Sequence, residues 1–180
     1  MSLWKILYHE KYLIINADNT NISPEQNALL RENGKHAFIY LSICMADSQS
    51  TYWEQEWTTG SPNFVRERDS EADKTNYFRV NFWDPKWEST LINFTQYRIT
   101  SFGFSGVLLD DLGEYKNVLE KNLNAAARMV LLAKNVAKFI KQQDPWMKLW
   151  MQDAIELYNI DNFKDALDGI SIEASSRRSY

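Results

Sequence analysis

The stretch Gly103-Phe104-Ser105-Gly106-Val107-Leu108-Leu109-Asp110-Asp111 combines a helix stop, a short apolar strand and two carboxylates. Gly103 is expected to end a helix, and the apolar residues after it predict a buried strand. Acids that follow such a strand lie at its carboxyl end, where α/β proteins bind their ligands. A second run of this kind, Gly169-Ile170-Ser171-Ile172-Glu173, comes near the end of the chain. Two strands that each end in an acid predict acid/base chemistry at one shared site.

Strand and helix patterns alternate along the rest of the chain. Four further strands are expected at 12–18, 37–43, 77–83 and 147–152. Ser23 with Pro24 predicts a helix start, Asp84 with Pro85 predicts a second, and 122–143 predicts an amphipathic helix. The alternation indicates a parallel sheet with helices outside it. Six strands are fewer than the eight of a closed (β/α)₈ barrel, so the pattern fits an open doubly wound sheet or an incomplete barrel.

Length and composition limit the classes of protein. The 180 residues predict a single domain over 1–180, with a long polar loop at about 46–76 whose charged part, 66–74, is expected to be flexible. A net charge of −4 gives no electrostatic reason to expect a nucleic-acid partner. One cysteine and two histidines are too few for a disulfide framework or a cysteine-rich zinc site, so we predict no metal and no cofactor.

The sequence also gives expectations about membrane insertion and the cellular compartment. It holds no apolar stretch of about 18 residues, so no membrane span is expected. No signal peptide is recognised at the start of the printed chain, which predicts either a cytoplasmic protein or a secreted one whose leader has been trimmed.

Six motifs in a fixed order carry a family resemblance. They are Tyr40-Leu41-Ser42-Ile43, Tyr52-Trp53, the run from Tyr77 to Trp87, the Gly103–Asp110 run, Met151-Gln152-Asp153-Ala154-Ile155-Glu156-Leu157, and the Asp168–Glu173 run. This series resembles the endo-α-1,4-polygalactosaminidase-like glycoside hydrolases (glycoside hydrolase family 114 and its uncharacterised relatives). The resemblance implies a TIM-barrel fold from which the first strand and the last one or two are missing. It also implies hydrolysis of an amino-sugar polymer by two acids, whose motif positions are Asp110 and Glu173.

Two carboxyl groups can supply the proton donor and the nucleophile or base that glycosidic cleavage needs. We expect Glu173 to be the donor and Asp110 the nucleophile or charge-stabilising partner. Seven further residues are candidates for binding the sugar polymer: Asp18, Tyr40, Asp47, Trp83, Asp111, Trp150 and Gln152. Several of them have a structural alternative. Asp18 could anchor a turn, Asp111 could be a solvated neighbour, and the tryptophans could be core residues.

Other functions remain open at this point. Where the family usually has Gly-Glu, this chain has Cys44-Met45, which favours a non-catalytic carbohydrate-binding or scaffold protein as the alternative function. Paired acids after a strand are also found at magnesium-dependent phosphoryl-transfer sites, although the sequence has no phosphate-binding glycine loop. A barrel that lacks strands exposes sheet edges, so we expect a homodimer through those edges or terminal segments that cover them.

Overall fold

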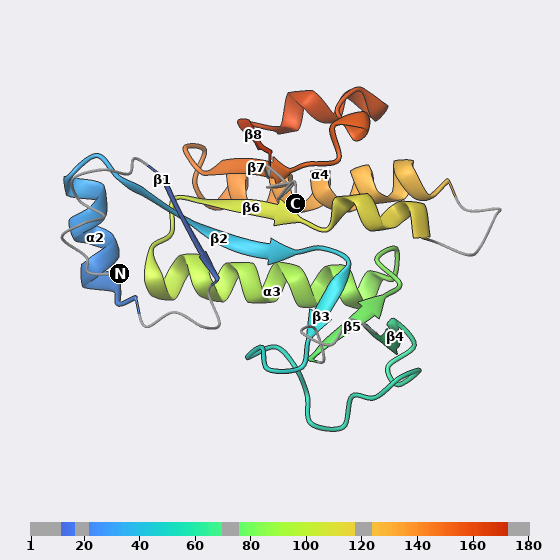
Figure 1. Cartoon of the computed structure of the whole chain (residues 1–180). Helices are drawn as coiled ribbons and strands as arrows, with labels where there is room; N and C mark the ends of the chain where they lie inside the picture. Colours follow the sequence, from blue (N-terminus) through green and yellow to red (C-terminus); the bar gives the residue numbers. More distant parts are fainter. Residues whose placement is uncertain (1–11, 17–21, 70–75, 118–123, 173–180) are drawn as a thin grey trace, which may run out of the picture.

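The protein is an incomplete (β/α) barrel of the TIM type, seen in Figure 1 as a curled parallel sheet with helices on one side. The computed structural model describes residues 12–16, 22–69, 76–117 and 124–172. Five parallel strands pair in the order β1-β2-β6-β7-β8. Their bounds are β1 Tyr12–Asn16, β2 His36–Ser42, β6 Gly106–Asp110, β7 Lys148–Gln152 and β8 Gly169–Ser171.

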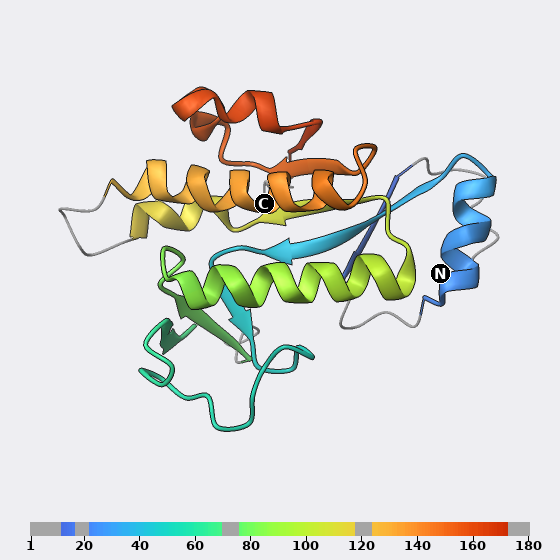
Figure 2. The same cartoon turned by 180° about the vertical axis from the view of Figure 1, so that it is seen from behind.

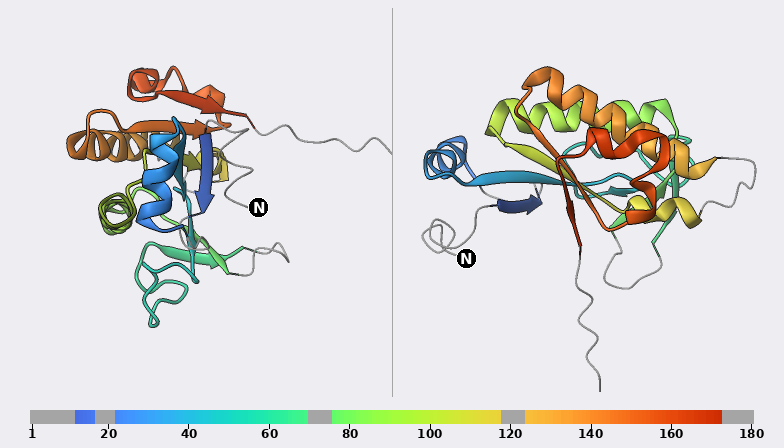
Figure 3. Two further views of the ribbon diagram at one scale, coloured as in Figure 1. Left: turned by 90° about the vertical axis from the view of Figure 1, so that its left-hand side faces the viewer. Right: turned by 90° about the horizontal axis from the view of Figure 1, so that it is seen from above.

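Three helices cover the convex face of this sheet, as Figures 2 and 3 show from behind and from the side. They are α2 Pro24–Glu32, α3 Pro85–Phe102 and α4 Ala125–Gln143. The ends of α2 and α3 are capped by residues close to them in sequence. Ser23 and Gln26 form the expected capping box, Asp84 accepts a hydrogen bond from the backbone N–H of Lys86, and Gly103 ends α3 in the left-handed region at φ 69°. Short 3₁₀ helices occupy η1 Leu112–Asn117, η2 Ile155–Leu157 and η3 Ile160–Ala166.

The strand expected at 77–83 does not belong to the parallel sheet. It forms β5 Tyr77–Val80, which pairs antiparallel with β3 Met45–Asp47 and β4 Val65–Arg68 in a separate three-stranded sheet. Only Phe78 and Val80 of β5 are buried, which is the alternation of an antiparallel strand with one covered face. Within the described residues, five of the six expected strands pair in the parallel sheet and the strand at 77–83 does not, because the pairing partner of a strand is set by contacts distant in sequence.

The segment 46–76 was expected to be a polar loop, but part of it forms regular secondary structure. It contains most of β3, all of β4 and a cluster of aromatic rings in which Trp53 packs on Trp57 and Phe78, and Trp57 packs on Phe64. The part from Val65 to Arg68 is a strand rather than a flexible stretch. Residues 70–75 lie outside the described residues.

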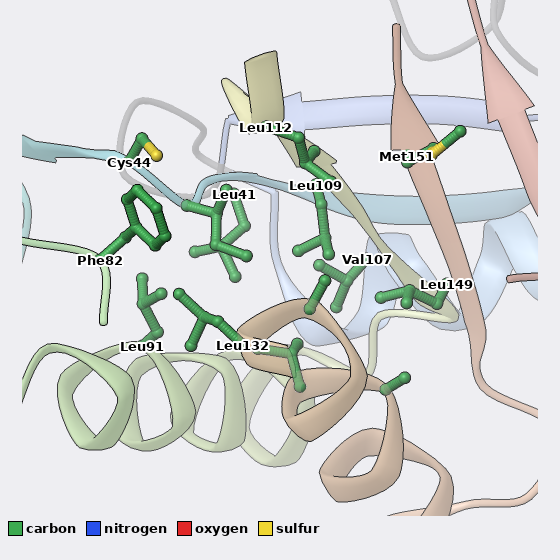
Figure 4. Packing of buried hydrophobic residues seen from close by; sticks show 14 of the residues in the cluster. Leu41, Cys44, Phe82, Leu91, Val107, Leu109, Leu112, Leu132, Leu149 and Met151 are labelled. Carbon is green, nitrogen blue, oxygen red and sulfur yellow. The ribbon is translucent and has the colours of Figure 1, made fainter. Parts of the chain in front are cut away.

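The hydrophobic core lies between the convex face and the helices. Figure 4 shows Leu91 of α3 and Leu132 of α4 pointing toward Leu41 and Leu109 of the sheet. All four are buried, and Leu91 and Leu109 are fully removed from solvent. Burying a leucine side chain contributes about 1.5–3 kcal/mol, so this layer holds the strands in place relative to one another. Alternate residues of the same strands face the opposite, concave side and are available to build a site.

Candidate functional site

Three neighbouring strands end in polar residues at the same edge of the sheet. Ser42 of β2 is the register partner of Asp110 of β6, and Gln152 ends β7 beside them. Because the strands are parallel, these residues share the carboxyl edge, where the loops that follow the strands also begin. The sequence-based expectation that Asp110 lies at a strand end is confirmed.

The Asp110 carboxylate accepts three hydrogen bonds that fix its orientation. The hydroxyl of Tyr40 donates to Oδ2 at 2.6 Å, and Nε2 of Gln152 donates to the same oxygen at 3.2 Å. The backbone N–H of Asp111 donates to Oδ1 at 2.7 Å. A group held this way is an oriented acceptor, which suits a nucleophile or a carboxylate that stabilises positive charge.

Tyr40 is a fixed hydrogen-bond donor. Burial raises the pKa of Tyr40 far above its usual value, and the hydrogen bond to Asp110 and the charge of Asp111 raise it further. The phenol therefore stays protonated across the physiological range, and it can donate to Asp110 throughout.

The residues after β6 and β7 adopt the same unusual backbone conformation. Asp111 has φ 60° and Asp153 has φ 53°, in the left-handed region that aspartate enters more readily than most residues. Asp111 Oδ2 accepts a short hydrogen bond from the hydroxyl of Ser42, and the backbone N–H of Asp153 donates to the Ser171 carbonyl at 2.8 Å. Both turns bring a carboxylate to the rim beside Asp110.

These residues line a cleft of about 690 Å³. Its volume lies within the roughly 300–1,000 Å³ typical of small-molecule sites. Five carboxylates and no lysine or arginine are among the described lining residues, so the cleft is strongly negative. The complete lining is Tyr40, Met45, Asp69, Tyr77, Asp110, Asp111, Glu114, Gln152 and Asp153.

Glu114, one of the five carboxylates, is paired with a cation. Glu114 forms a short salt bridge with Arg79 of β5 and also accepts a hydrogen bond from Asn117 at 3.0 Å. Burial lowers the pKa of Arg79, but the attraction of Glu114 outweighs it, so the pKa lies above the ordinary arginine value. This salt bridge joins the small antiparallel sheet to η1 at the margin of the cleft.

The structure brings four of the residues expected at the site together and places three elsewhere. Tyr40, Asp110, Asp111 and Gln152 line the cleft. Asp47 instead accepts a hydrogen bond from the backbone N–H of Gln49, at 2.8 Å. Trp83 packs edge-on against Phe82 beside a smaller pocket.

Trp150 lies below the cleft, on the concave face. Its ring contacts Tyr12 and Phe38, with ring centroids 4.7 and 5.1 Å apart. A Cβ on the register partner Gly169 would lie 2.7 Å from the Trp150 indole, so the glycine leaves room for the ring. Trp150 thus supports the floor beneath the cleft and is not a platform within it.

Asp18 and Glu173, the latter expected to be the proton donor, lie outside the described residues. Several cleft residues were not among the candidates: Met45, Asp69, Tyr77, Glu114 and Asp153. Asp153 lies within one of the six motifs and Glu114 follows the end of another by four residues, which was a usable signal. Asp69 and Tyr77 reach the cleft only through the antiparallel sheet, which the sequence pattern did not indicate.

The described part of the chain holds neither a metal-binding group of side chains nor a helix that could span a membrane. Within residues 12–16, 22–69, 76–117 and 124–172, no group of three or more His, Cys, Asp and Glu side chains is arranged to hold a metal ion. Over the same residues, no helix combines the length and the apolar character that crossing a bilayer requires. Cys44 is buried, and burial raises the pKa of its thiol, which disfavours the thiolate that a nucleophilic cysteine needs.

No family model matches the chain, but three curated proteins are similar to it. Uncharacterized proteins of Thermotoga maritima and Deinococcus radiodurans are 23% and 28% identical, each over 81% of this chain and 46% of their own length. An uncharacterized protein of Methanocaldococcus jannaschii is 28% identical over 68% of this chain and 34% of its own length. The chain therefore spans about half the length, or less, of the curated relatives it matches.

Solved structures give a clearer likeness. The glycoside hydrolase domain of PelA from Pseudomonas aeruginosa has a TM-score of 0.71 and 16% identity, over 97% of this chain and 63% of that one. Aspergillus fumigatus Ega3, solved in complex with galactosamine, has a TM-score of 0.71 and 11% identity, over 92% and 60%. The resemblance drawn from the motifs is thereby confirmed at the level of fold: the chain has the architecture of these glycoside hydrolases and covers about three fifths of it.

Proposed function

We propose that this chain forms part of a glycoside hydrolase that cleaves an amino-sugar polysaccharide, and that it contributes the acidic cleft of the active site. The observation that carries the proposal is the position of Asp110, held by Tyr40 and Gln152 at the carboxyl edge of a parallel sheet. That edge is where TIM-barrel enzymes place their reacting groups. Asp110 would serve as the nucleophile or as the carboxylate that stabilises the oxocarbenium-like transition state.

The second acid of the pair is proposed to be Glu173. It follows β8, the strand next to β7 at the same end of the sheet. The carboxyl group of Glu173 is the proposed general acid. It would protonate the leaving oxygen while Asp110 faces the anomeric carbon.

The charge of the cleft supports an amino-sugar substrate. Its lining includes five carboxylates, so a polymer with protonated amino groups would be attracted to it. N-acetylation removes that positive charge from the sugar. We therefore expect de-N-acetylated galactosamine oligomers to be better substrates than N-acetylated ones.

The proposal is tested by incubating the protein with both kinds of oligomer and measuring chain length by mass spectrometry. Cleavage is expected for the unchanged protein, and it should be lost in Asp110→Asn and in Glu173→Gln. Asp165→Asn is the matched control, because Asp165 is an exposed acid outside the cleft lining. Binding without cleavage would overturn the enzyme assignment in favour of a sugar-binding relative, and cleavage that survives in Asp110→Asn would exclude the assigned role.

A further inference from the structure

A second pocket lies at the opposite end of the sheet from the acidic cleft. It has a volume of about 270 Å³. Tyr12, His36 and Lys148, the first residues of β1, β2 and β7, are among its lining residues. The pocket therefore lies at the amino ends of the strands, whereas Asp110 stands at their carboxyl ends. Figure 1 shows α2 beside the amino end of β2.

This pocket offers an arginine whose hydrogen-bonding groups are unused within the described part of the chain. Arg31, in the last turn of α2, lies against the backbone of Gly103, where an added Cβ would be 3.3 Å from Nη2. Within the part of the chain that the structure describes, its guanidinium makes no hydrogen bond or ion pair. The Lys148 ammonium, by contrast, is paired with Asp168 at 3.1 Å. An unpaired guanidinium suits two-point binding of a carboxylate.

The rest of the pocket suits the body of a ring. Phe104 and Met147 are each 3% exposed and line it with apolar surface. Trp146 is 82% exposed, so a large flat ring faces solvent at the pocket, where it can stack on a ligand. Asp144 accepts a hydrogen bond from the backbone N–H of Trp146 at 2.9 Å through Oδ1, which leaves Oδ2 to accept from a ligand hydroxyl.

We propose that this pocket is an accessory site for a sugar ring that carries a carboxylate, as in a uronic acid. The carboxylate would pair with Arg31, the apolar face of the ring would lie on Trp146, and a hydroxyl would donate to Asp144. The volume is slightly below the roughly 300 Å³ at which pockets for drug-sized ligands begin, so it suits a single ring. The site goes beyond the proposed hydrolysis, because it uses none of the residues that line the acidic cleft.

The test is a calorimetric titration of the unchanged protein with galacturonic acid, galactose and benzoate. Galacturonic acid should bind, and galactose, which lacks the carboxylate, should bind at least about tenfold more weakly. Benzoate carries its carboxylate on an aromatic ring instead of a sugar ring. It should bind more weakly than galacturonic acid, because it has no hydroxyl to donate to Asp144. Tighter binding of benzoate or equal binding of galactose would overturn the assignment, as would the absence of galacturonate binding.

Variants then test the residues. Arg31→Gln and Trp146→Ala should each weaken galacturonate binding at least about tenfold. Arg128→Gln removes a positive charge from an exposed arginine of α4 outside the pocket and should bind normally. Asp110→Asn should also bind normally, which separates this site from the hydrolase proposal. Unchanged affinity in both Arg31→Gln and Trp146→Ala, with normal thermal unfolding, would disprove the site.

Discussion

Tyr40 donates a 2.6 Å hydrogen bond to Asp110, although the two residues are 70 positions apart in the chain. Tyr40 stands two residues before Ser42, the register partner of Asp110, so both side chains lie on the concave face of adjacent strands. The phenol of Tyr40 thus reaches Oδ2 along the concave face, and both residues line the cleft. This contact makes Tyr40 a positioning residue for the proposed nucleophile.

Tyr40→Phe should slow hydrolysis without unfolding the protein. A hydrogen bond to a charged group contributes about 1.5–3 kcal/mol, which corresponds to roughly a 10- to 100-fold decrease in kcat. The measurement is the rate of shortening of galactosamine oligomers at saturating substrate. Tyr97→Phe, which removes a hydroxyl from a tyrosine that is 51% exposed on α3, is the control. An unchanged rate in Tyr40→Phe would contradict the positioning role.

Gly106→Ala should destabilise the sheet beneath the site. A Cβ at residue 106 would lie 2.5 Å from the backbone oxygen of Lys148 and 3.0 Å from the Phe38 ring, so β6 and β7 would have to separate locally. We expect a loss of about 1–3 kcal/mol in the free energy of unfolding, measured by urea denaturation. Gly113→Ala is the matched control, because an added Cβ there has nothing within 4 Å. Equal stability of the two variants would refute the close packing of β6 on β7.

Asp168 links stability to pH. Burial alone would raise the pKa of Asp168, but hydrogen bonds from Lys141, the Leu149 backbone and Lys148 outweigh it and lower the pKa. A carboxyl with a lowered folded-state pKa stabilises the protein fully above its unfolded pKa of about 3.9, and that stability is lost as the pH falls through the folded value.

Asp168→Asn should therefore cost about 1 kcal/mol near pH 7 and less below pH 4. The measurement is the free energy of unfolding as a function of pH for the variant and for the unchanged protein. Asp165→Asn removes an exposed carboxylate from η3 and should shift the curve little. A difference between Asp168→Asn and the unchanged protein that grows toward acid pH would contradict the assigned sign.

The edges of the parallel sheet remain the basis for a predicted homodimer. In the described residues, β1 and β8 form those edges, and both bear exposed apolar side chains: Ile14 is 43% exposed and Ile170 is 38% exposed. Light scattering should show a dimer that Ile14→Lys dissociates, since charge on an edge strand opposes pairing. Leu131→Lys, at a 58% exposed position on α4, should leave the dimer intact. A monomer at all protein concentrations would exclude pairing through these edges.

Helix ends were readable from the sequence because their signals are local. The Ser23 box, the Asp84 cap and the Gly103 stop each satisfy backbone groups within a few residues, and all three form as expected. The place of β1 in the sheet was not readable in the same way. The pattern at 12–18 predicted a strand but not its place at the edge of the sheet, where Tyr12 and Ile14 are 37% and 43% exposed.

By itself, the sequence determined the alternation of strands and helices, the position of Asp110 at a strand end and the resemblance to a family of glycoside hydrolases. Those features depend on residue order within short windows or on motifs read in series. Only the tertiary structure decided that β5 joins a second sheet, that Tyr40 and Gln152 hold Asp110, and that Trp150 lies beneath the cleft. The physical reason is that strand pairing and side-chain contact join residues distant in sequence, and local propensity carries no information about such partners.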